Sequence, residues 1–167
     1  MNKTLLSLLL CLTFGVTAGP AYDLFGDGVF SLKWGAQPES VMATYPSGKK
    51  TKNFGITLIE IKDDRAVFGL NRSKNDTIRF AFDSENRLSG VSIDFSPNDF
   101  PMLHQKLITQ FGQPQSPPSV MSGTVILVWE NDNGVILSLN RQARVTSLSI
   151  GFDALQKPKN TKEDLGF

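Results

Sequence analysis

The sequence predicts an α+β domain of two tandem halves, each a helix followed by an antiparallel meander, with the helices packed on one face of the sheet. Residues 78–95 align without a gap on residues 135–152, so one segment occurs twice. Within each copy, apolar and polar residues alternate in two arms around a polar turn, which is typical of a β-hairpin. A stretch with apolar residues at helical spacing precedes each hairpin.

Identical residues in the two copies fall mainly in the second arm, at Arg87/Arg144, Ser92/Ser149, Ile93/Ile150 and Phe95/Phe152. The helical stretches lie further apart in the sequence than the hairpins do, so the first half carries extra residues. We expect these extra residues in polar loops at residues 47–53 and 71–76. The two halves then form either one continuous antiparallel sheet or two abutting sheets.

The N-terminus has the three parts of a secretory signal peptide. A short basic region at residues 2–4 precedes an apolar run at residues 5–16, and small residues follow. The run is too short to span a bilayer. We expect residues 1–18 to be removed, with cleavage after Ala21 as the alternative, which leaves a periplasmic or secreted protein without a transmembrane segment.

The chain's one cysteine, Cys11, lies within this apolar run. A lipidated cysteine needs a small residue before it, whereas Leu10 precedes Cys11, so we expect no lipidation. The mature chain then has no disulfide and no thiol chemistry. An exported domain of this size without disulfides favours a bacterial periplasm.

The first half begins with short elements separated by turn residues. Pro38 suits the first turn of a helix, in which Val41 and Tyr45 share an apolar face, and Pro46 ends it. The other elements predicted for this half are a linker at residues 19–27, strands at 28–34, 56–61 and 66–70, and a polar loop at 47–53.

The second half contains the clearest helix. Asn98 or Asp99 caps this helix, Pro101 lies in its first turn, and Gly112 ends it. The segments that follow are an irregular loop at residues 113–122, a strand at 124–130, a tight turn at 131–134, the second hairpin and a mobile polar tail at 154–167. The globular domain therefore spans residues 28–153, with pseudo-repeats at 28–95 and 98–152.

Alternation and helical spacing together predict which side chains form the core. The strands supply Phe80, Phe82, Val91, Ile93, Phe95, Leu137, Leu139, Leu148, Ile150 and Phe152. The helices supply Val41, Tyr45, Phe100, Leu103, Leu107 and Phe111. Trp129 alternates with other apolar residues, so we expect it in the core as well. The face of the sheet left to solvent carries Arg79, Ala81, Ser92, Asp94, Ser138, Ser149 and Gly151.

Two segments of the chain share a short helix that ends in Pro or Gly. They read Trp34-Gly-Ala-Gln-Pro-Glu-Ser-Val41 with Tyr45-Pro46, and Leu107 with Phe111-Gly-Gln-Pro114. These openings, and the order of elements behind them, resemble small bacterial envelope domains of the SmpA/OmlA outer-membrane assembly lipoproteins and of the β-lactamase-inhibitor-protein fold. The resemblance implies an envelope protein that works through its surface. The lipidation motif of the first group and the disulfides of the second are missing, and no functional residue carries over.

Composition and motifs argue against most catalytic and nucleic-acid-binding classes. The net charge is +1 with interspersed signs, so no basic face for nucleic acid is expected. The sequence has no Gly-x-Ser-x-Gly turn, no Gly-rich phosphate loop and no set of His and Cys ligands, so we expect neither a metal nor a cofactor. The one histidine, His104, is expected at the surface or at the boundary of the core. The alternative is a small periplasmic hydrolase that pairs His104 with a nearby carboxylate.

Surface features favour binding of a protein partner. Arg79 and Asp94 lie on the solvent face of the sheet, and a Pro pair stiffens the loop beside it. Trp34 either packs on the helix that follows it or stands exposed as an anchor. The predicted partner-binding residues are Trp34, Arg79, Asp94, Ser116, Pro117, Pro118 and Ser119. We therefore expect an exported, non-enzymatic protein of the inhibitor, immunity or envelope-assembly type.

The signal peptide predicts the mass of the exported protein. Because small residues follow the apolar run, the mature chain should begin near Gly19 and carry no lipid. Mass spectrometry of the exported form measures both properties. An intact Met1 terminus, or lipid attached to Cys11, would contradict the prediction.

Overall fold

The computed structural model describes residues 20–53, 55–115, 119–121 and 124–155. The predicted signal peptide, residues 116–118 of the predicted binding loop and nearly all of the predicted tail lie outside the described residues.

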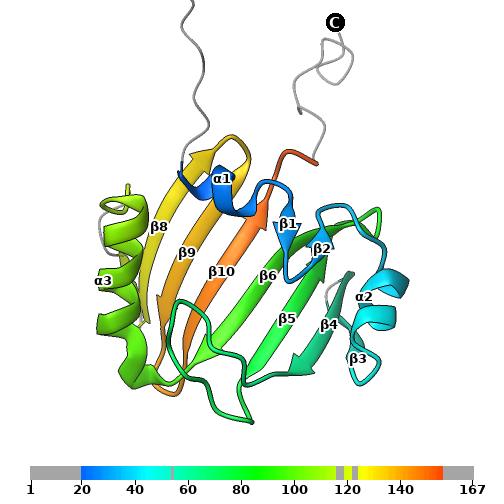
Figure 1. Cartoon of the computed structure of the whole chain (residues 1–167), viewed down its shortest axis with the longest axis horizontal. Coiled ribbons are helices and arrows are strands. Elements are labelled where there is room, and N and C mark those ends of the chain that lie inside the picture. Colours follow the sequence, from blue (N-terminus) through cyan, green and yellow to red (C-terminus); the bar gives the residue numbers. More distant parts are fainter. Residues whose placement is uncertain (1–19, 54, 116–118, 122–123, 156–167) are drawn as a thin grey trace, which may run out of the picture.

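A helix followed by an antiparallel meander occurs twice along the chain (Figure 1). The helices are α1 (Pro20–Phe25), α2 (Pro38–Thr44), α3 (Phe100–Phe111) and the 3-10 turn η1 (Pro97–Asp99). The strands are β1 (Gly28–Val29), β2 (Leu32–Lys33), β3 (Lys49–Asn53), β4 (Ile56–Lys62), β5 (Thr77–Phe82), β6 (Leu88–Phe95), β7 (Ser119–Met121), β8 (Thr124–Asp132), β9 (Val135–Arg141) and β10 (Thr146–Phe152).

One antiparallel sheet of eight strands carries the fold, in the order β3-β4-β5-β6-β10-β9-β8-β7, and β1 pairs with β2 separately. Of the two arrangements that the sequence left open, the continuous sheet is therefore correct. Each half ends in a central strand, and these strands, β6 and β10, pair with each other. Figure 1 shows α2 and α3 at opposite ends of the sheet, with α1 and the β1–β2 hairpin between them.

The pairing of β6 with β10 relates the two halves by a local two-fold axis. Ser92 pairs directly with Ser149, its equivalent in the repeat. On either side, Ile93 pairs with Leu148, and Val91 pairs with Ile150. Exchanging the two copies of the repeat leaves this set of pairs unchanged, so the axis passes between Ser92 and Ser149.

The gap-free alignment of the repeat is wrong in the first arm of the hairpin. Phe80 pairs with Val91, whereas its aligned residue Leu137 pairs with Ile150, the equivalent of Ile93 and not of Val91. The first arms are therefore shifted by two residues relative to the alignment. The cause is the position of the turn: the first hairpin pairs as far as Phe82 with Leu88, whereas the second pairs as far as Arg141 with Thr146, so its first arm runs two residues further before the chain turns. A shift of two keeps every side chain on its predicted face.

The core lies between the sheet and the helices, as predicted. All of the predicted strand residues are buried except Phe152, which is half-buried. Among the predicted helical residues, three are buried, Val41, Leu103 and Leu107, and three are half-buried, Tyr45, Phe100 and Phe111. Trp129 is also in the core, and its indole Nε1 donates to the carbonyl oxygen of Gly112 at 2.8 Å. The predicted Gly112 helix end is confirmed by its φ of 80°.

Several short elements differ from the prediction because tertiary contacts, not local pattern, decide them. Residues 20–25 of the predicted linker form α1, which packs against α3, β8 and β9. The single strand predicted at residues 28–34 is two strands joined by a tight turn, in which Phe30 and Ser31 have φ of 53° and 64°. The polar side chain that accepts a hydrogen bond before α3 is Ser96, from the Asn98 backbone, and Asp99 caps nothing.

Both edges of the sheet were predicted as loops. Residues 49–53 form β3, whose side chains are all exposed, and Ser119–Met121 form β7. Because the side chains of β3 are all exposed, its sequence lacks the apolar alternation that identifies a half-buried strand. Conversely, residues 66–70 are not a strand: a single bridge joins Val67 to Leu70.

The extra residues of the first half lie in the connection between β4 and β5, at residues 63–76. In the second half, β8 and β9 are joined by a tight turn at Asn133 and Gly134, as the sequence predicted. Figure 1 shows the long connection crossing in front of the sheet, on the side that carries the helices. It buries Leu70 and Arg72 there and so covers sheet surface that the helices leave open.

Shortening a buried side chain where β6 pairs with β10 should show that the two halves share one core. Leu148 is fully buried at the centre of the sheet, so Leu148→Ala should lower the free energy of unfolding by about 2–5 kcal/mol. Its neighbour Ser149 faces away from the core, and Ser149→Ala should change stability by less than about 0.5 kcal/mol. Urea unfolding of both variants should give one transition. Two separate transitions would show that the halves have independent cores.

Candidate functional site

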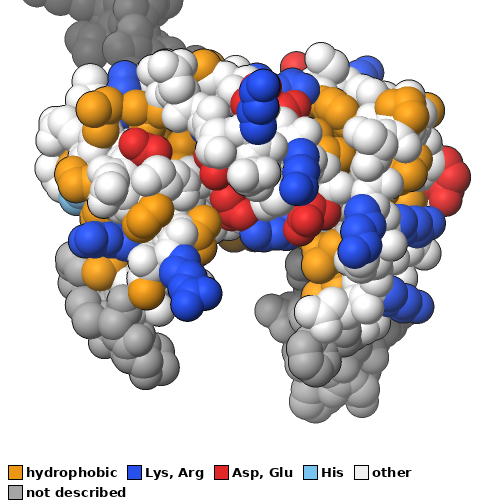
Figure 2. All heavy atoms as spheres, turned by 90° about the horizontal axis from the view of Figure 1, so that it is seen from below, with side chains coloured by type: hydrophobic (Ala, Val, Ile, Leu, Met, Phe, Trp, Pro, Cys, Tyr) orange, Lys and Arg blue, Asp and Glu red, His pale blue; other side chains and the backbone are white. Residues whose placement is uncertain are grey.

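The face of the sheet that the helices leave open carries small and polar side chains at its centre. Strand alternation places Ala81 of β5, Gly90 and Ser92 of β6, and Ser149 and Gly151 of β10 on this face. Figure 2 shows the molecule arched from below, with a recess between its two ends. The sequence predicted a solvent-facing surface of this composition, and we take it as the candidate site.

Two glycines face each other across the central strands. Gly90 pairs with Gly151, and neither has a positive φ. A Cβ atom on Gly90 would lie 3.6 Å from the Ile150 carbonyl oxygen, and one on Gly151 would meet nothing closer than 3.9 Å. The fold therefore accepts side chains at both positions. Glycine in the interior of a strand often marks a bulge or a place where another group approaches closely. Gly90 borders the register shift opposite Ala81, so a bulge accounts for it, whereas Gly151 lies in unbroken register on both sides and points to a close approach.

The absent side chains leave a hollow of about 340 Å³ in the open face. Its lining includes Leu58 at one end, Ala81 and the two glycines along the floor, and Arg79 and Ser92 at the side. The hollow is shallow and open to solvent. It suits one side chain of a larger partner better than an enclosed small molecule.

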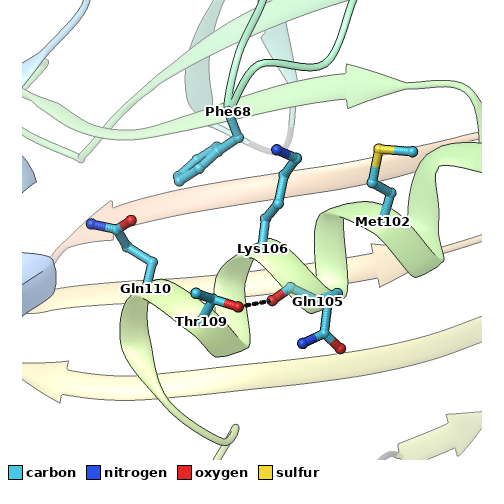
Figure 3. Close-up of a pocket in the computed structure, with 6 residues that line it drawn as sticks. All are labelled: Phe68, Met102, Gln105, Lys106, Thr109 and Gln110. Atoms are coloured by element: carbon cyan, nitrogen blue, oxygen red, sulfur yellow. Dashed lines mark hydrogen bonds between the residues drawn. The ribbon is translucent and has the colours of Figure 1, made fainter.

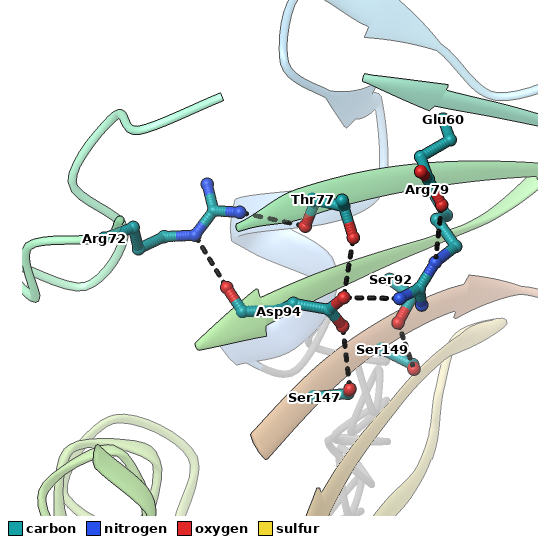
Figure 4. Close-up of polar contacts among 8 residues, drawn as sticks. All are labelled: Glu60, Arg72, Thr77, Arg79, Ser92, Asp94, Ser147 and Ser149. Carbon is teal, nitrogen blue, oxygen red and sulfur yellow. Dashed lines mark hydrogen bonds and ion pairs between the residues drawn. The ribbon is translucent and has the colours of Figure 1, made fainter. Parts of the chain in front are cut away.

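An ion cluster lies beside the hollow (Figure 4). Asp94 accepts hydrogen bonds from Thr77 Oγ1 at 2.6 Å, from Ser147 Oγ at 2.9 Å and from Arg79 Nη2. Arg79 Nε also donates to Glu60 at 3.3 Å. Asp94 is 7% exposed, so it is buried and fully satisfied, whereas the Arg79 and Glu60 side chains are 36% and 43% exposed.

A second cation, Arg72, donates hydrogen bonds to the backbone of two residues of this cluster. The buried Arg72 donates from Nε to the Asp94 carbonyl oxygen and from Nη2 to the Thr77 carbonyl oxygen, at 2.8 and 2.9 Å. Its Nη1 has no hydrogen-bond partner among the described residues and lies 3.9 Å from Asp63. Burial lowers the pKa of Arg72, and the nearby carboxylates of Asp76, Asp63 and Asp94 oppose that shift.

Asp63 is held in its charged form. Burial alone would raise the pKa of Asp63, but hydrogen bonds from the side chain and backbone of Arg65, and the charges of Arg65 and Arg72, hold it below its ordinary value. A lowered pKa means that Asp63 stabilises the folded state above about pH 4 and that this contribution is lost as the pH falls through the lowered value.

The structure brings together only some of the predicted partner-binding residues. Arg79 and Asp94 are in contact on the open face, but Asp94 is buried there and holds the two central strands together. Trp34 is not a free anchor: its Nε1 donates to the Phe25 carbonyl oxygen at 2.6 Å, and its ring stacks on Phe152 at 5.5 Å. Ser119 begins the edge strand β7, and Ser116, Pro117 and Pro118 lie outside the described residues.

Gly151 was predicted on the solvent face, but its pairing with Gly90 was missed, although the sequence contains a sign of it. Gly90 and Gly151 each interrupt an alternating strand at a solvent-facing position, where a β-branched or polar residue is usual. Neither position is a turn. That pattern could have identified the floor of the hollow before the structure was known.

His104 is a boundary residue, as predicted. Its ring lies 5.8 Å from that of Phe100 and 6.4 Å from that of Trp129. Its Nε2 is buried, without a hydrogen-bond partner among the described residues, and no ion pair joins the ring to a described carboxylate. The described structure thus gives the alternative hydrolase no acid–base pair at this position.

A second hollow, of about 460 Å³, lies between α3 and the long connection (Figure 3). Phe68 reaches over it from the connection, and Lys106 and Met102 rise from the helix. The hydrogen bond drawn there, from Thr109 Oγ1 to the Gln105 carbonyl oxygen, is internal to the helix. Nothing in its lining combines an acid with a base, and this groove is the weaker candidate.

Within the described part of the chain, no group of three or more His, Cys, Asp and Glu residues could hold a metal ion. No helix among the described residues has the length and apolar character needed to cross a membrane. Comparisons with protein-family models, with curated proteins and with solved structures found no match for this chain.

The two carboxylates that contact Arg79 should differ in their effect on stability. Asp94→Ala should lower the free energy of unfolding by about 1.5–3 kcal/mol, because hydrogen bonds to a buried charged group are lost. Glu60→Gln, at the exposed partner, should cost about 0–1 kcal/mol. Urea unfolding at neutral pH measures both. Equal effects would mean that Asp94 does not organise the central strands.

Proposed function

We propose that this is an exported, non-enzymatic protein that binds a protein partner on the open face of its sheet. The observation that carries the proposal is the pair of glycines at the centre of that face. Glycine costs a strand stability, and at Gly151, which lies in unbroken register, neither the backbone conformation nor the available space requires it. The hollow that it leaves is suited to an anchor residue of a partner.

The rest of the face supports the same proposal. The surface is concave, so it fits a convex loop or turn of another protein (Figure 2). Small side chains at its centre let a partner approach the backbone closely, and the ion cluster around Asp94 holds the central strands rigid. A rigid surface loses little conformational entropy on binding.

The biological setting of the proposal comes from the sequence. The signal peptide at residues 1–18 favours a periplasmic or secreted protein. An inhibitor, an immunity-type protein or an envelope-assembly factor would each act by binding alone. A hydrolase at His104 is the second candidate that the sequence allowed, and no observation in the described structure favours it.

Filling the hollow should abolish partner binding without unfolding the protein. Gly151→Val places a β-branched side chain at a strand position where a Cβ atom makes only ordinary contacts, and Arg79→Gln removes the charge beside it without adding a like charge next to the buried Asp94. A partner captured from the native envelope by the wild-type protein should bind each variant at least about 30-fold more weakly, the equivalent of losing a hot spot of about 2 kcal/mol.

Matched controls lie away from the open face. His104→Ala, on α3, and Lys106→Gln, at the other groove, should leave the affinity for the partner unchanged. The proposal is wrong if His104→Ala abolishes the biological activity of the protein and Gly151→Val leaves it intact. That pattern would indicate catalysis at His104 rather than binding on the open face.

A further inference from the structure

The lining of the hollow comes from four adjacent strands, β4, β5, β6 and β10. Leu58, Ala81, Gly90 and Gly151 are joined in that order by direct cross-strand pairing, and we call this row the slot. The two glycines form its floor, where only backbone is present. Leu58 closes one end with an aliphatic side chain, and at the other end Gly151 pairs with Ile136 of β9. A floor without side chains leaves room for the face of an aromatic ring.

One long side of this slot is polar. The neighbouring row of the sheet pairs Arg79 with Ser92, Ser92 with Ser149, and Ser149 with Ser138. The Ser149 hydroxyl donates to that of Ser92 across a long distance of 3.4 Å, and Arg79 Nη1 has no acceptor among the described residues. The row thus offers both a donor and an acceptor to a group that enters the slot.

The polar row is asymmetric about the local two-fold axis. Arg79 and Ser138 occupy equivalent positions, since each pairs with one of the two central serines. Only the Arg79 side offers a cation, so a polar tip in the slot is drawn toward Arg79. The partner then has one orientation on an otherwise symmetric sheet.

We propose, on the basis of the proposed function, that the slot binds a tyrosine side chain presented on a convex loop of the partner protein. The ring lies on the Gly90–Gly151 backbone, next to Leu58. The phenol hydroxyl donates to the Ser92–Ser149 pair and accepts from Arg79. Phenylalanine and leucine would fill the slot but leave this row without a partner, which costs affinity.

Charged residues fit the slot poorly. A lysine or arginine would place its charge over an apolar floor, where the nearest carboxylates, Glu60 and Asp94, are already paired with Arg79, and a carboxylate would lie close to the same two acids. Tyrosine alone among common anchors combines a planar apolar body with a tip that both donates and accepts.

The test uses a disulfide-closed turn peptide with a single tyrosine at its tip, and the same peptide with phenylalanine or leucine there. Titration followed by NMR should shift the amide signals of β6 and β10, with the tyrosine peptide binding at least about fivefold more tightly than the phenylalanine peptide.

Variants of the protein locate the binding site. Gly151→Val should abolish binding of the peptide, and Gly90→Ala serves as a second variant with a filled hollow, because a Cβ there has only ordinary contacts. Arg79→Gln should remove the preference for tyrosine, and Lys106→Gln should change nothing.

Different experimental outcomes would refute the tyrosine slot and the proposed function. Equal binding of the tyrosine and phenylalanine peptides, shifts elsewhere on the molecule, or no binding at all would overturn the tyrosine slot. If partner capture is still lost in Gly151→Val, the open face remains the binding surface with a different anchor. If capture is unaffected by Gly151→Val, the proposed function itself fails.

Discussion

The pairing of β6 with β10 is the interaction on which the rest of the structure depends. It joins the last strand of each half through backbone hydrogen bonds, so two meanders that would otherwise have exposed edges become one sheet. The pairing sets the register at Ser92 and Ser149, and this register aligns the apolar side chains of both halves on one face. The shared core, including Ile93 and Leu148, then follows from strand alternation.

The same alternation gives the opposite face its character. Each residue that packs in the core is followed by one that faces solvent, so the central strands can carry serines and glycines without weakening the core. Asp94 is the exception on this face, because it is buried and accepts hydrogen bonds from side chains of β5 and β10. Asp94 pairs with Ser147, and the Ser92–Ser149 pair lies between it and the glycines, so its hydrogen bonds join the three strands at the polar side of the hollow.

Sequence reasoning succeeded where burial gives a regular pattern. The hairpins, α3, the turn at Asn133 and Gly134, and the central core all follow from period-2 or helical spacing, which buried elements must obey. It failed at β3, whose side chains are all exposed, at the short edge strand β7, and at α1, which is held by contacts with distant strands. The repeat was visible, yet its register was not, because the first arm of the second hairpin runs two residues further before the turn, which moves the pairing without changing any face. Of the candidate site, Arg79 and Asp94 were identified, but not that Asp94 is buried, since its burial depends on partners from two other strands, β5 and β10.

Two glycines at turns and two in the central strands have different physical causes, and the difference bears on function. Gly112 and Gly134 have φ of 80° and 94°, a conformation that other residues adopt with strain, so the fold itself requires them. Gly90 and Gly151 have no positive φ and room for a Cβ atom, and they lower stability by about 0.5–1 kcal/mol each relative to alanine. Gly90 borders the register shift opposite Ala81, whereas Gly151 lies in unbroken register, so its cost has no conformational cause within the fold. The proposed partner would supply a cause, because a side chain at Gly151 would occupy the place of the group that enters the hollow.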